Sequence, residues 1–455
     1  MNQRRTTDYD LVAIGSGSAA LAAAIRARDW GRSVLLAERG TTGGTCVNVG
    51  CVPSKSLLSD SERANGTRLA DAVTRKDALV TLLREEKYVE LIADYGVEHR
   101  AGEARVTGPH TIEVDGVELR GEALLIAAGA RPAAPPIPGL DQVEYLTSES
   151  AIDLAEAPRR LAVIGANAVG LELGQMLAGF GSEVTFLDAA ARIAPFEEPE
   201  VSEALSVILE ADGARVIASA QVAEVAMEEG SKILRGAAAG EPLELHADEI
   251  LVATGRRANT ADLGLEELGV ELDDTGAVIV DRQQRTSVPS IYAAGDVTAQ
   301  PQFVYVAAAG GAAAAANALG LGDESLDLDS LPRVTFTRPQ IAAAGMTESQ
   351  AKERGFEFET RVLGLDAVPR ALVNGETRGL FKLVAERDTG RLLGVSVLAA
   401  GAGDVIQSAV LAIRAEMTVE DLTRAWAPYL TMAEGLKLTA QAFDRDVARL
   451  SCCAA

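Results

Sequence analysis

The 455-residue sequence predicts an α/β protein with two doubly wound domains and a C-terminal α+β domain. A glycine-rich motif lies between an apolar stretch and a helical pattern at Gly15, and again at Gly165. Each time an acidic residue, Glu38 or Asp188, ends the next apolar stretch 23 positions after that glycine. Such a strand–turn–helix–strand unit is typical of a Rossmann-like, dinucleotide-binding domain. The motif does not return after 323–332, where short apolar runs alternate with helical patterns.

The first unit starts with a strand over Tyr9–Ile14, followed by GSGSAA at residues 15–20 and a helix to about Trp30. The glycines permit a tight turn and the close approach of a pyrophosphate, which the helix N-terminus attracts. A carboxylate at the end of the second strand can accept hydrogen bonds from ribose hydroxyls. We therefore expect one dinucleotide on Gly15, Gly17, Ala20 and Glu38.

The second unit repeats this order, with strands at Leu161–Ile164 and Glu183–Leu187 around GANAVG at residues 165–170. Asn167 replaces the middle glycine, which narrows the approach to the backbone. A decayed duplicate is the alternative, but the acid at matching distance favours a second dinucleotide site. Its expected residues are Gly165, Gly170 and Asp188.

The remaining segments complete the predicted sheets. Asp296 ends a strand within Ser290–Val297, where it could meet a ligand's hydroxyls or cap the following Ala-rich helix. Other strands are predicted within Glu122–Pro132 and Glu249–Asn259, and at Val334–Phe336, Phe381–Val384 and Leu392–Leu398; helices are predicted at Gly403–Arg414 and Glu434–Phe443.

A cysteine pair stands out in GGTCVNVGCVPSK, residues 43–55. On a regular helix Cys46 and Cys51 would lie roughly 7.5 Å apart along the axis, whereas a disulfide needs Cα atoms about 4.4–6.8 Å apart. A bond therefore requires a distorted turn, which Gly44 and Gly50 make available. Two thiolates converging on a metal are also possible. The chain's other two cysteines, Cys452 and Cys453, are adjacent near the C-terminus.

Composition narrows the partners and the compartment. The net charge of −24 disfavours nucleic acid and anionic membranes as partners. There is no apolar run of about 18 residues and no basic-plus-apolar leader at Met1–Asp10, so we expect a cytoplasmic protein. In that compartment a close cysteine pair is more often catalytic or metal-binding than structural.

Together with IAAGARP, ATGRRAN and AAGDV, these motifs resemble the pyridine nucleotide–disulfide oxidoreductases over residues 8–443. Within that family PQFVYVAAAG, LDAVPRALVNGETRGLFKLV, APYLTMAEGLKL and LSCCAA resemble the mercuric reductases. The chain begins at the flavin domain, without the N-terminal metal-binding module that many of them carry, and Ser56–Val80 is shorter than in some relatives. The resemblance implies four parts: an FAD-binding domain in 1–150 and 276–330, an NAD(P)H-binding domain in 151–275, and a dimerisation domain with a Cys-Cys tail in 331–455.

The resemblance also implies residue roles. Cys51 would be the thiolate nearer the flavin and Cys46 the outer one, while Lys55 and Glu172 would form an ion pair beside the flavin ring. FAD would be held by the first motif together with Gly44, Thr45, Lys55 and Asp296, and the nicotinamide coenzyme by the second motif.

One departure from the family indicates the substrate. Disulfide reductases of this family keep a C-terminal histidine that protonates a leaving thiolate, but Tyr429 stands at that place, five before Glu434. With a pKa near ~10, tyrosine is a poor proton shuttle at neutral pH. Reduction of a metal ion needs no such shuttle, and Tyr429 and Tyr88 could line the metal pocket. Ordinary packing is the alternative for both tyrosines.

The expected activity is therefore reduction of Hg(II) to Hg(0) with electrons from NAD(P)H through FAD and the Cys46/Cys51 pair. Hg(II)–thiol complexes would first be captured by Cys452 and Cys453 of the partner subunit in a homodimer. Soft thiolates suit a soft cation such as Hg(II). The family mostly uses NADPH, whereas Asp188 favours NADH; Arg192 could soften that preference or be a surface charge.

Three alternatives remain open at this point. The chain could be a thioredoxin-reductase-like enzyme, a dihydrolipoamide-type or other small-disulfide reductase, or a thiol metal buffer without turnover.

Overall fold

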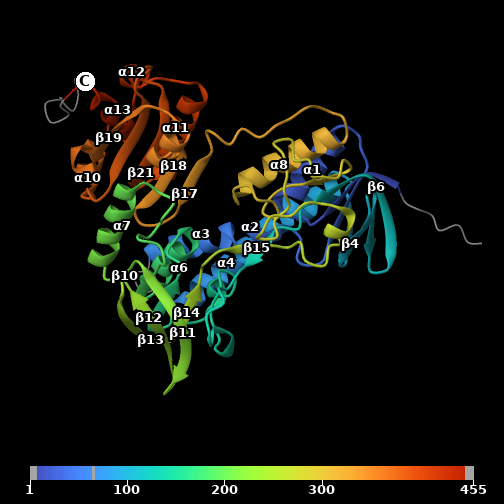
Figure 1. The fold of residues 1–455 in the computed structure, drawn as a ribbon, viewed down its shortest axis with the longest axis horizontal. Coiled ribbons are helices and arrows are strands. Elements are labelled where there is room, and N and C mark those ends of the chain that lie inside the picture. Colours follow the sequence, from blue (N-terminus) through green and yellow to red (C-terminus); the bar gives the residue numbers. More distant parts are fainter. Residues whose placement is uncertain (1–7, 64–66, 446–455) are drawn as a thin grey trace, which may run out of the picture. The chain divides into compact units, whose positions relative to one another are not determined.

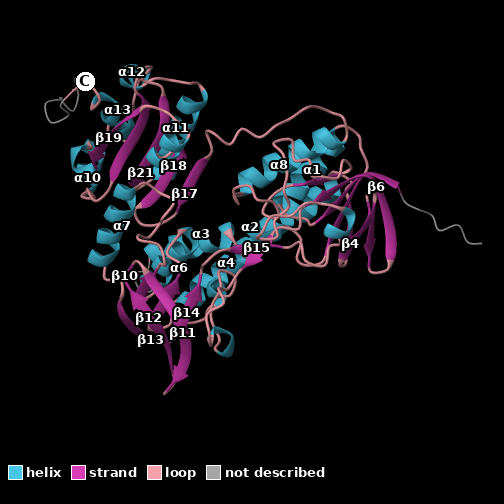
Figure 2. Ribbon diagram, in the orientation of Figure 1, coloured by secondary structure: helices cyan, strands magenta, loops and turns pink. Residues whose placement is uncertain are grey.

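The computed structural model describes residues 8–63 and 67–445, which form two compact units. Figures 1 and 2 show mixed helix and strand in both. No helix among the described residues is long and apolar enough to cross a membrane. Unit 1 consists of the chain up to Ala134 with Thr147–Glu156 and Gly255–Leu326, and unit 2 consists of Pro135–Leu146, Ala157–Thr254 and the chain from Asp327.

Unit 1 is built on a seven-stranded sheet. Its order is β3 (Glu98–Ala101), β2 (Val34–Glu38), β1 (Asp8–Ile14), β6 (Val117–Ile126), β5 (Thr111–Val114) and β4 (Ala104–Gly108), with β16 (Ile291–Ala293) paired to β6. β3, β2, β1, β6 and β16 are parallel, whereas β4, β5 and β6 form an antiparallel meander. β1 and β2 are apolar along most of their length, as expected of parallel strands covered on both faces.

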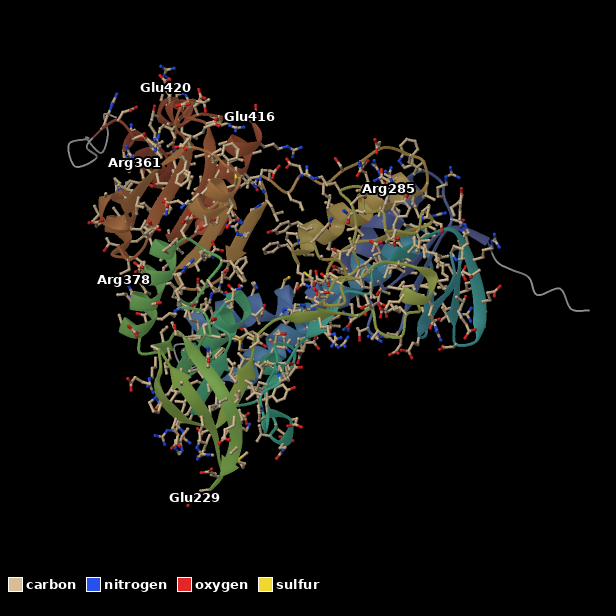
Figure 3. The ribbon with its side chains drawn as sticks, viewed as in Figure 1. Glu229, Arg285, Arg361, Arg378, Glu416 and Glu420 are labelled. Atoms are coloured by element: carbon tan, nitrogen blue, oxygen red, sulfur yellow. The ribbon has the colours of Figure 1, made fainter. Side chains whose placement is uncertain are left out.

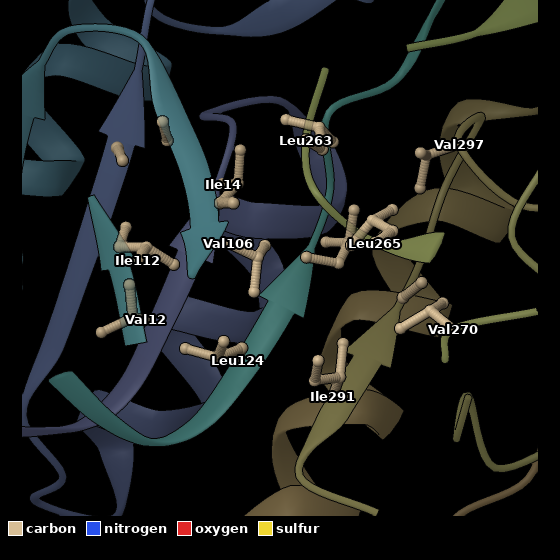
Figure 4. Close-up of a cluster of buried hydrophobic side chains, with 14 of the residues drawn as sticks. Val12, Ile14, Val106, Ile112, Leu124, Leu263, Leu265, Val270, Ile291 and Val297 are labelled. Carbon is tan, nitrogen blue, oxygen red and sulfur yellow. The ribbon is translucent and has the colours of Figure 1, made fainter. Parts of the chain in front are cut away.

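One face of this sheet carries a core of branched aliphatic side chains (Figure 4). Val12 and Ile14 of β1 and Leu124 of β6 pack there with Leu265 and Val270, from the segment that precedes β16. This packing fixes the ends of the parallel strands, so the loops that follow them start from defined positions.

Two helices made largely of small residues cover the other face. In α1 (Ser18–Asp29) and α8 (Val304–Ala318), alanine and glycine form most of the contact surface. The helices approach so closely that an ideal Cβ on Gly311 would lie 2.0 Å from the carbonyl oxygen of Ala19. Unit 1 also contains α2 (Gly44–Asn48), α3 (Cys51–Glu62), α4 (Leu69–Arg84), a π-helical turn η1 (Glu85–Val89), α5 (Glu90–Asp94), the 3-10 turns η3 (Ala151–Asp153) and η4 (Glu266–Leu268), and the antiparallel pair β7 (Ala130–Pro132) and β15 (Arg256–Ala258).

Unit 2 contains a second parallel sheet. Its order is β10 (Arg215–Ile217), β9 (Glu183–Leu187), β8 (Arg160–Ile164) and β14 (Glu249–Val252), accompanied by α6 (Ala168–Gly179) and α7 (Pro199–Ala211). A separate antiparallel sheet is formed by β11 (Ala220–Glu228), β12 (Ser231–Ala238) and β13 (Glu241–Ala247).

The C-terminal part of unit 2 is an antiparallel sheet covered by helices. The strand order is β17 (Pro332–Thr335), β18 (Gln340–Gly345), β21 (Leu392–Ala399), β20 (Leu380–Glu386) and β19 (Phe358–Gly364). The helices are α9 (Glu348–Glu353), α10 (Pro369–Asn374), α11 (Ala402–Arg414), α12 (Val419–Arg424) and α13 (Glu434–Gln441).

A buried lysine joins this sheet to the nucleotide-type part of unit 2. Most charged side chains point into solvent, as Glu229, Arg378 and Glu420 do in Figure 3. Lys382 of β20, by contrast, is 1% exposed and bonded to three carboxylates. Its Nζ lies 3.0 Å from Glu198, 2.8 Å from Glu200 and 2.8 Å from Glu348. Glu198 is also buried, so removing Lys382 would leave an uncompensated buried carboxylate, and the cluster holds β20, α7 and α9 together.

The predicted fold class is confirmed. The expected strands at Tyr9–Ile14, Leu161–Ile164 and Glu183–Leu187 are present within one residue. The sequence analysis does not anticipate the β11–β13 sheet or β18 and β19. β18 reads QIAAAG, whose alanines and glycine have little strand preference. Pairing with β17 and β21 on either side, which is not visible in the local pattern, makes it a strand.

We expect Gly311→Ala to lower the free energy of unfolding by about 1–3 kcal/mol, because the added methyl group meets backbone that cannot move alone. Gly322→Ala is the matched control, since its Cβ would make only ordinary contacts with side chains, at 3.6 Å from Glu324 and 3.9 Å from Ala316. Urea denaturation of both variants measures the difference. Equal stability of the two would contradict the close α1–α8 contact.

Candidate active site

The first glycine loop joins β1 to α1 and has the form that a pyrophosphate requires. Gly15 has φ +112°, and a Cβ there would lie 2.3 Å from the carbonyl oxygen of Ala127. Gly17 is the N-cap of α1 and has no side chain to occupy the helix N-terminus. The N–H groups of the first turn therefore face an open approach, as at anion sites on helix N-termini.

Glu38 lies beside this loop because its carboxylate bonds back to it. One carboxylate oxygen, Oε2, accepts hydrogen bonds from the Ser16 N–H at 3.0 Å and the Ser16 hydroxyl at 2.7 Å. The other, Oε1, accepts from the Gly40 N–H at 2.7 Å. The remaining lone pairs suit the two hydroxyls of a ribose.

The second glycine loop repeats this pattern in unit 2. Gly165 has φ +97°, and its Cβ would lie 2.5 Å from the carbonyl oxygen of Ala253. Asp188 accepts from the Ala166 N–H and the Ala190 N–H, each at 2.8 Å. Asn167 is the N-cap of α6 with extended backbone, so the side chain that replaces glycine leaves the turn intact.

The cysteine segment is two short helices separated by a break. Cys46 lies in α2, Cys51 is the first residue of α3, and Gly50 between them has the non-helical dihedrals φ −123°, ψ −109°. The non-helical turn that a bond between the two cysteines would require is therefore present at Gly50. Gly44, the first residue of α2, has φ +67°, and its Cβ would lie 2.7 Å from the Cα of Gly17. The cysteine segment thus rests directly on the first glycine loop.

Two further groups hold the cysteine segment in place. The Gly43 N–H donates to Ser16 Oγ at 3.2 Å. The Asn48 side-chain amide donates to the carbonyl oxygens of Thr42, at 3.0 Å, and Gly44, at 2.9 Å. The sequence analysis missed both Ser16 and Asn48. Their positions inside motifs could have drawn attention to them, but no spacing rule assigns them a role.

The structure holds Cys46 and Cys51 as thiols, with Cys46 half-buried and Cys51 exposed. Hydrogen bonding to Cys51 raises the pKa of Cys46, burial adds to this, and the charge of Lys55 acts in the opposite direction. Cys51 lies in the first turn of α3, where the helix dipole stabilises a thiolate. The pair therefore favours a thiolate on Cys51 and a proton on Cys46.

Tyr88 lies beside the thiols. Its hydroxyl is 3.3 Å from Ser18 Oγ, and its Cγ would be 3.3 Å from a Cβ on Gly43, where the cysteine segment begins. Burial raises the pKa of Tyr88, and the negative charge of either cysteine raises it further, against a lowering by Ser18. Tyr88 keeps its proton at neutral pH and offers a neutral phenolic oxygen.

Asp296 lies in the same unit as the first glycine loop. Burial raises the pKa of its carboxyl, and the guanidinium of Arg256, with Nε 3.8 Å from Oδ2, lowers it in part. α8 begins at Val304 with Phe303 as its N-cap, so the alternative that Asp296 caps this helix is wrong. Pro301 lies in the intervening segment, and the residue before a proline, here Gln300, is disfavoured in helical conformation.

Two further predicted residues, Glu172 and Tyr429, belong to unit 2. Glu172 is buried on α6, and its Oε1 accepts from the Phe336 N–H at 2.8 Å. Tyr429 is 52% exposed and precedes Leu430, whose N–H donates to Glu434 at 2.8 Å. Pairing between Lys55 of unit 1 and Glu172 stays a prediction. Cys452 and Cys453 lie outside the described residues.

The residues present fit two dinucleotide cofactors. In unit 1 the glycine loop, Glu38 and Asp296 provide an open helix N-terminus, a ribose acceptor and a buried carboxylate, which suits FAD. In unit 2 the second loop and Asp188 suit a nicotinamide coenzyme. The thiol pair and Tyr88 lie next to the FAD-type loop.

Comparison with known proteins agrees with this geometry. Residues 9–311 match the family model described as pyridine nucleotide-disulphide oxidoreductase, and residues 331–440 match the dimerisation domain of that family. The mercuric reductase of Staphylococcus aureus is 48% identical over 99% of this chain and 85% of its own length. That of Streptomyces lividans is 49% identical over 98% of this chain and 99% of its own length.

Solved structures show the same fold. The HOCl-induced flavoprotein disulfide reductase RclA from Escherichia coli, in its Cu(II) complex, is 31% identical, with a TM-score of 0.89 over 96% of this chain and 100% of that one. LpdA from Mycobacterium tuberculosis is 26% identical, with a TM-score of 0.86 over 97% of this chain and 100% of that one. The resemblance inferred from the sequence is confirmed, and the chain belongs to the pyridine nucleotide-disulphide oxidoreductase family.

Proposed function

We propose that this protein reduces Hg(II) to Hg(0) as a flavin-dependent NAD(P)H:mercury(II) oxidoreductase. The observation that carries the proposal is the convergence of two thiols and a phenol on the FAD-type glycine loop. Relatives named mercuric reductase, at 43–49% identity over at least 97% of this chain, support it. FAD, when bound, accepts electrons from NAD(P)H and supplies two to the substrate.

The chain's own residues bind and orient the ion. Cys46 and Cys51 provide two soft thiolates, and Hg(II) needs only two in a linear arrangement. The helix dipole favours a thiolate at Cys51, whereas hydrogen bonding to Cys51 and burial raise the pKa of Cys46 and the charge of Lys55 offsets this only in part, so Cys46 loses its proton when the metal binds. Reduction to the neutral atom then removes the attraction between metal and sulfur, so the product leaves.

A second candidate function is disulfide reduction, because a solved relative carries that name. Disulfide reduction needs a proton donor for the leaving thiolate. Tyr429 stands where the family's histidine would be, and Glu434, which would orient that histidine, instead accepts the Leu430 N–H. The purified protein should therefore oxidise the coenzyme fastest when Hg(II) with excess thiol is the electron acceptor. Oxidation should be slower with Cu(II), lipoamide, glutathione disulfide or an aromatic disulfide.

The dimerisation-domain match supports a homodimer. We propose that Cys452 and Cys453 of the partner subunit capture Hg(II)–thiol complexes and pass the ion to Cys46 and Cys51 by thiolate exchange. Exchange between sulfurs lets a tightly bound ion move without being released.

The inner pair is tested by Cys46→Ala and Cys51→Ala. We expect each to abolish Hg(II)-dependent coenzyme oxidation, because a single thiolate can neither complete the site nor form the redox pair. Flavin absorbance should be unchanged, since the glycine loop holds the cofactor. If Cys46→Ala kept most of the turnover, the mechanism would be wrong.

The tail is tested by subunit mixing. A Cys46→Ala/Cys51→Ala chain and a Cys452→Ala/Cys453→Ala chain should each be inactive with bulky Hg(II)–thiol complexes. Their heterodimers should regain one working site, because the intact tail of one reaches the intact inner pair of the other. Heterodimers that form but show no activity above either parent would contradict transfer between subunits.

The coenzyme preference is tested by kcat/KM for NADH and NADPH at matched low concentrations. We expect NADH to be favoured, because Asp188 would face the charge of a 2′-phosphate. Arg192 is held by its own loop, with Nη2 donating to the carbonyl oxygens of Pro195, at 3.0 Å, and Glu197, at 3.3 Å. Asp188→Ala should reduce the ratio of kcat/KM for NADH to kcat/KM for NADPH about tenfold, which corresponds to ~1.4 kcal/mol.

Asp188→Asn is the matched control for loop geometry, since it keeps the shape and removes the charge. It should narrow the ratio as Asp188→Ala does. A clear NADPH preference in the unmutated protein would show that Asp188 does not decide the choice.

A further inference from the structure

A hydrogen bond connects the first glycine loop to the aromatic side chain beside the thiols. Ser18, the first residue of α1, has its hydroxyl oxygen 3.3 Å from the hydroxyl oxygen of Tyr88, 70 positions away in the chain. Both side chains are partly buried. The resemblance to known enzymes assigns Ser18 no role, and the proposed function does not use it.

Tyr88 lies in an irregular helical turn next to this contact. α4, η1 and α5 form one continuous helical run, and the π-helical turn η1 interrupts its regular spacing at Glu85–Val89. A π-turn is less favourable than α-helix and is often found at functional sites. Here it is accompanied by the approach of Tyr88 to Gly43 and to Ser18.

The chemistry of the three groups beside the loop is complementary. Cys46 and Cys51 supply the two thiolates, and each acts electrostatically on Tyr88. Either hydroxyl of the Ser18–Tyr88 pair can be the donor, and the phenolic oxygen keeps a lone pair for a further contact. In both cases the hydrogen bond fixes the orientation of the Tyr88 hydroxyl, which would otherwise rotate freely.

We infer that Ser18 is a positioning residue for the metal: through its hydrogen bond with the Tyr88 hydroxyl it orients the phenolic oxygen towards an Hg(II) ion held by Cys46 and Cys51. This rests on the proposed use of the two thiols for Hg(II). Ser18 acts only through Tyr88, so the two side chains form one functional group with the thiols. The glycine loop then serves the metal as well as the dinucleotide.

A double-mutant cycle tests this dependence. Ser18→Ala, Tyr88→Phe and the double variant are made in a Cys452→Ala/Cys453→Ala background, so that only the inner pair binds metal. The affinity for Hg(II) is measured by competition with a small dithiol, on FAD-containing protein in which Cys46 and Cys51 are reduced and the flavin is not. We expect each single variant to lose about 3–10-fold in affinity, as for one hydrogen bond or weak ligand, and the double variant to lose no more than Tyr88→Phe alone.

Two further variants serve as controls. Ser18→Thr keeps the hydroxyl and should restore the affinity. Thr74→Val removes a hydroxyl from α4 that donates only to Ala70 of its own helix, and it should change nothing. FAD affinity of the apoprotein is measured in parallel, because Ser18 also lies at the helix N-terminus of the dinucleotide loop.

Additive losses in the cycle would overturn the inference, as would a loss in Ser18→Ala confined to FAD affinity. Either result leaves the proposed function standing if Cys46→Ala abolishes Hg(II) binding in the same assay. If Cys46→Ala binds Hg(II) as the parent does, the proposed function fails instead.

Discussion

The close approach of two glycine backbones, Gly17 and Gly44, is the constraint on which the site depends. A single methyl group on Gly44 would lie 2.7 Å from the Cα of Gly17, so no other residue fits without separating the segments. This contact places the cysteine segment on the loop that suits FAD. The Gly43 N–H on Ser16 and the Asn48 amide on the carbonyl oxygens of Thr42 and Gly44 then hold it there. The thiols consequently have a defined position next to a dinucleotide loop.

The two glycine loops have the same local structure but different surroundings. Glu38 and Asp188 each bond to an N–H of their own glycine loop and to an N–H two residues further along the chain. The cysteine segment packs against the first loop, which places two thiols beside a loop of the dinucleotide-binding type. In unit 2, α6 instead carries Glu172, which bonds to the Phe336 N–H and so ties α6 to the C-terminal sheet. The buried cluster around Lys382 reinforces that attachment.

The proposed preference for a metal ion over a disulfide as substrate rests on Tyr429 and Glu434, near the C-terminus. A tyrosine at 429 cannot serve as a proton shuttle near neutral pH. Glu434 is engaged with Leu430, a residue with φ +58°, and thereby stabilises the turn that presents Tyr429. Around the thiols themselves, the nearby aromatic group is again a phenol, Tyr88. In unit 1 the structure thus brings a phenolic oxygen and two sulfurs to the first glycine loop.

The sequence by itself determined the fold class, the two dinucleotide loops with their acids, the broken helix between the cysteines and the family. These features are local: glycine spacing, an acid at a strand end and residue order within one segment specify them directly. The tertiary structure decided what brings the segments together. Ser16 and Ser18 reach Gly43 and Tyr88 across 27 and 70 positions, and β18 becomes a strand only through its neighbours. Asp296 proved not to cap α8, because the helix begins later than its composition indicates. Contacts between distant segments depend on the packing of the whole unit, which no local pattern encodes.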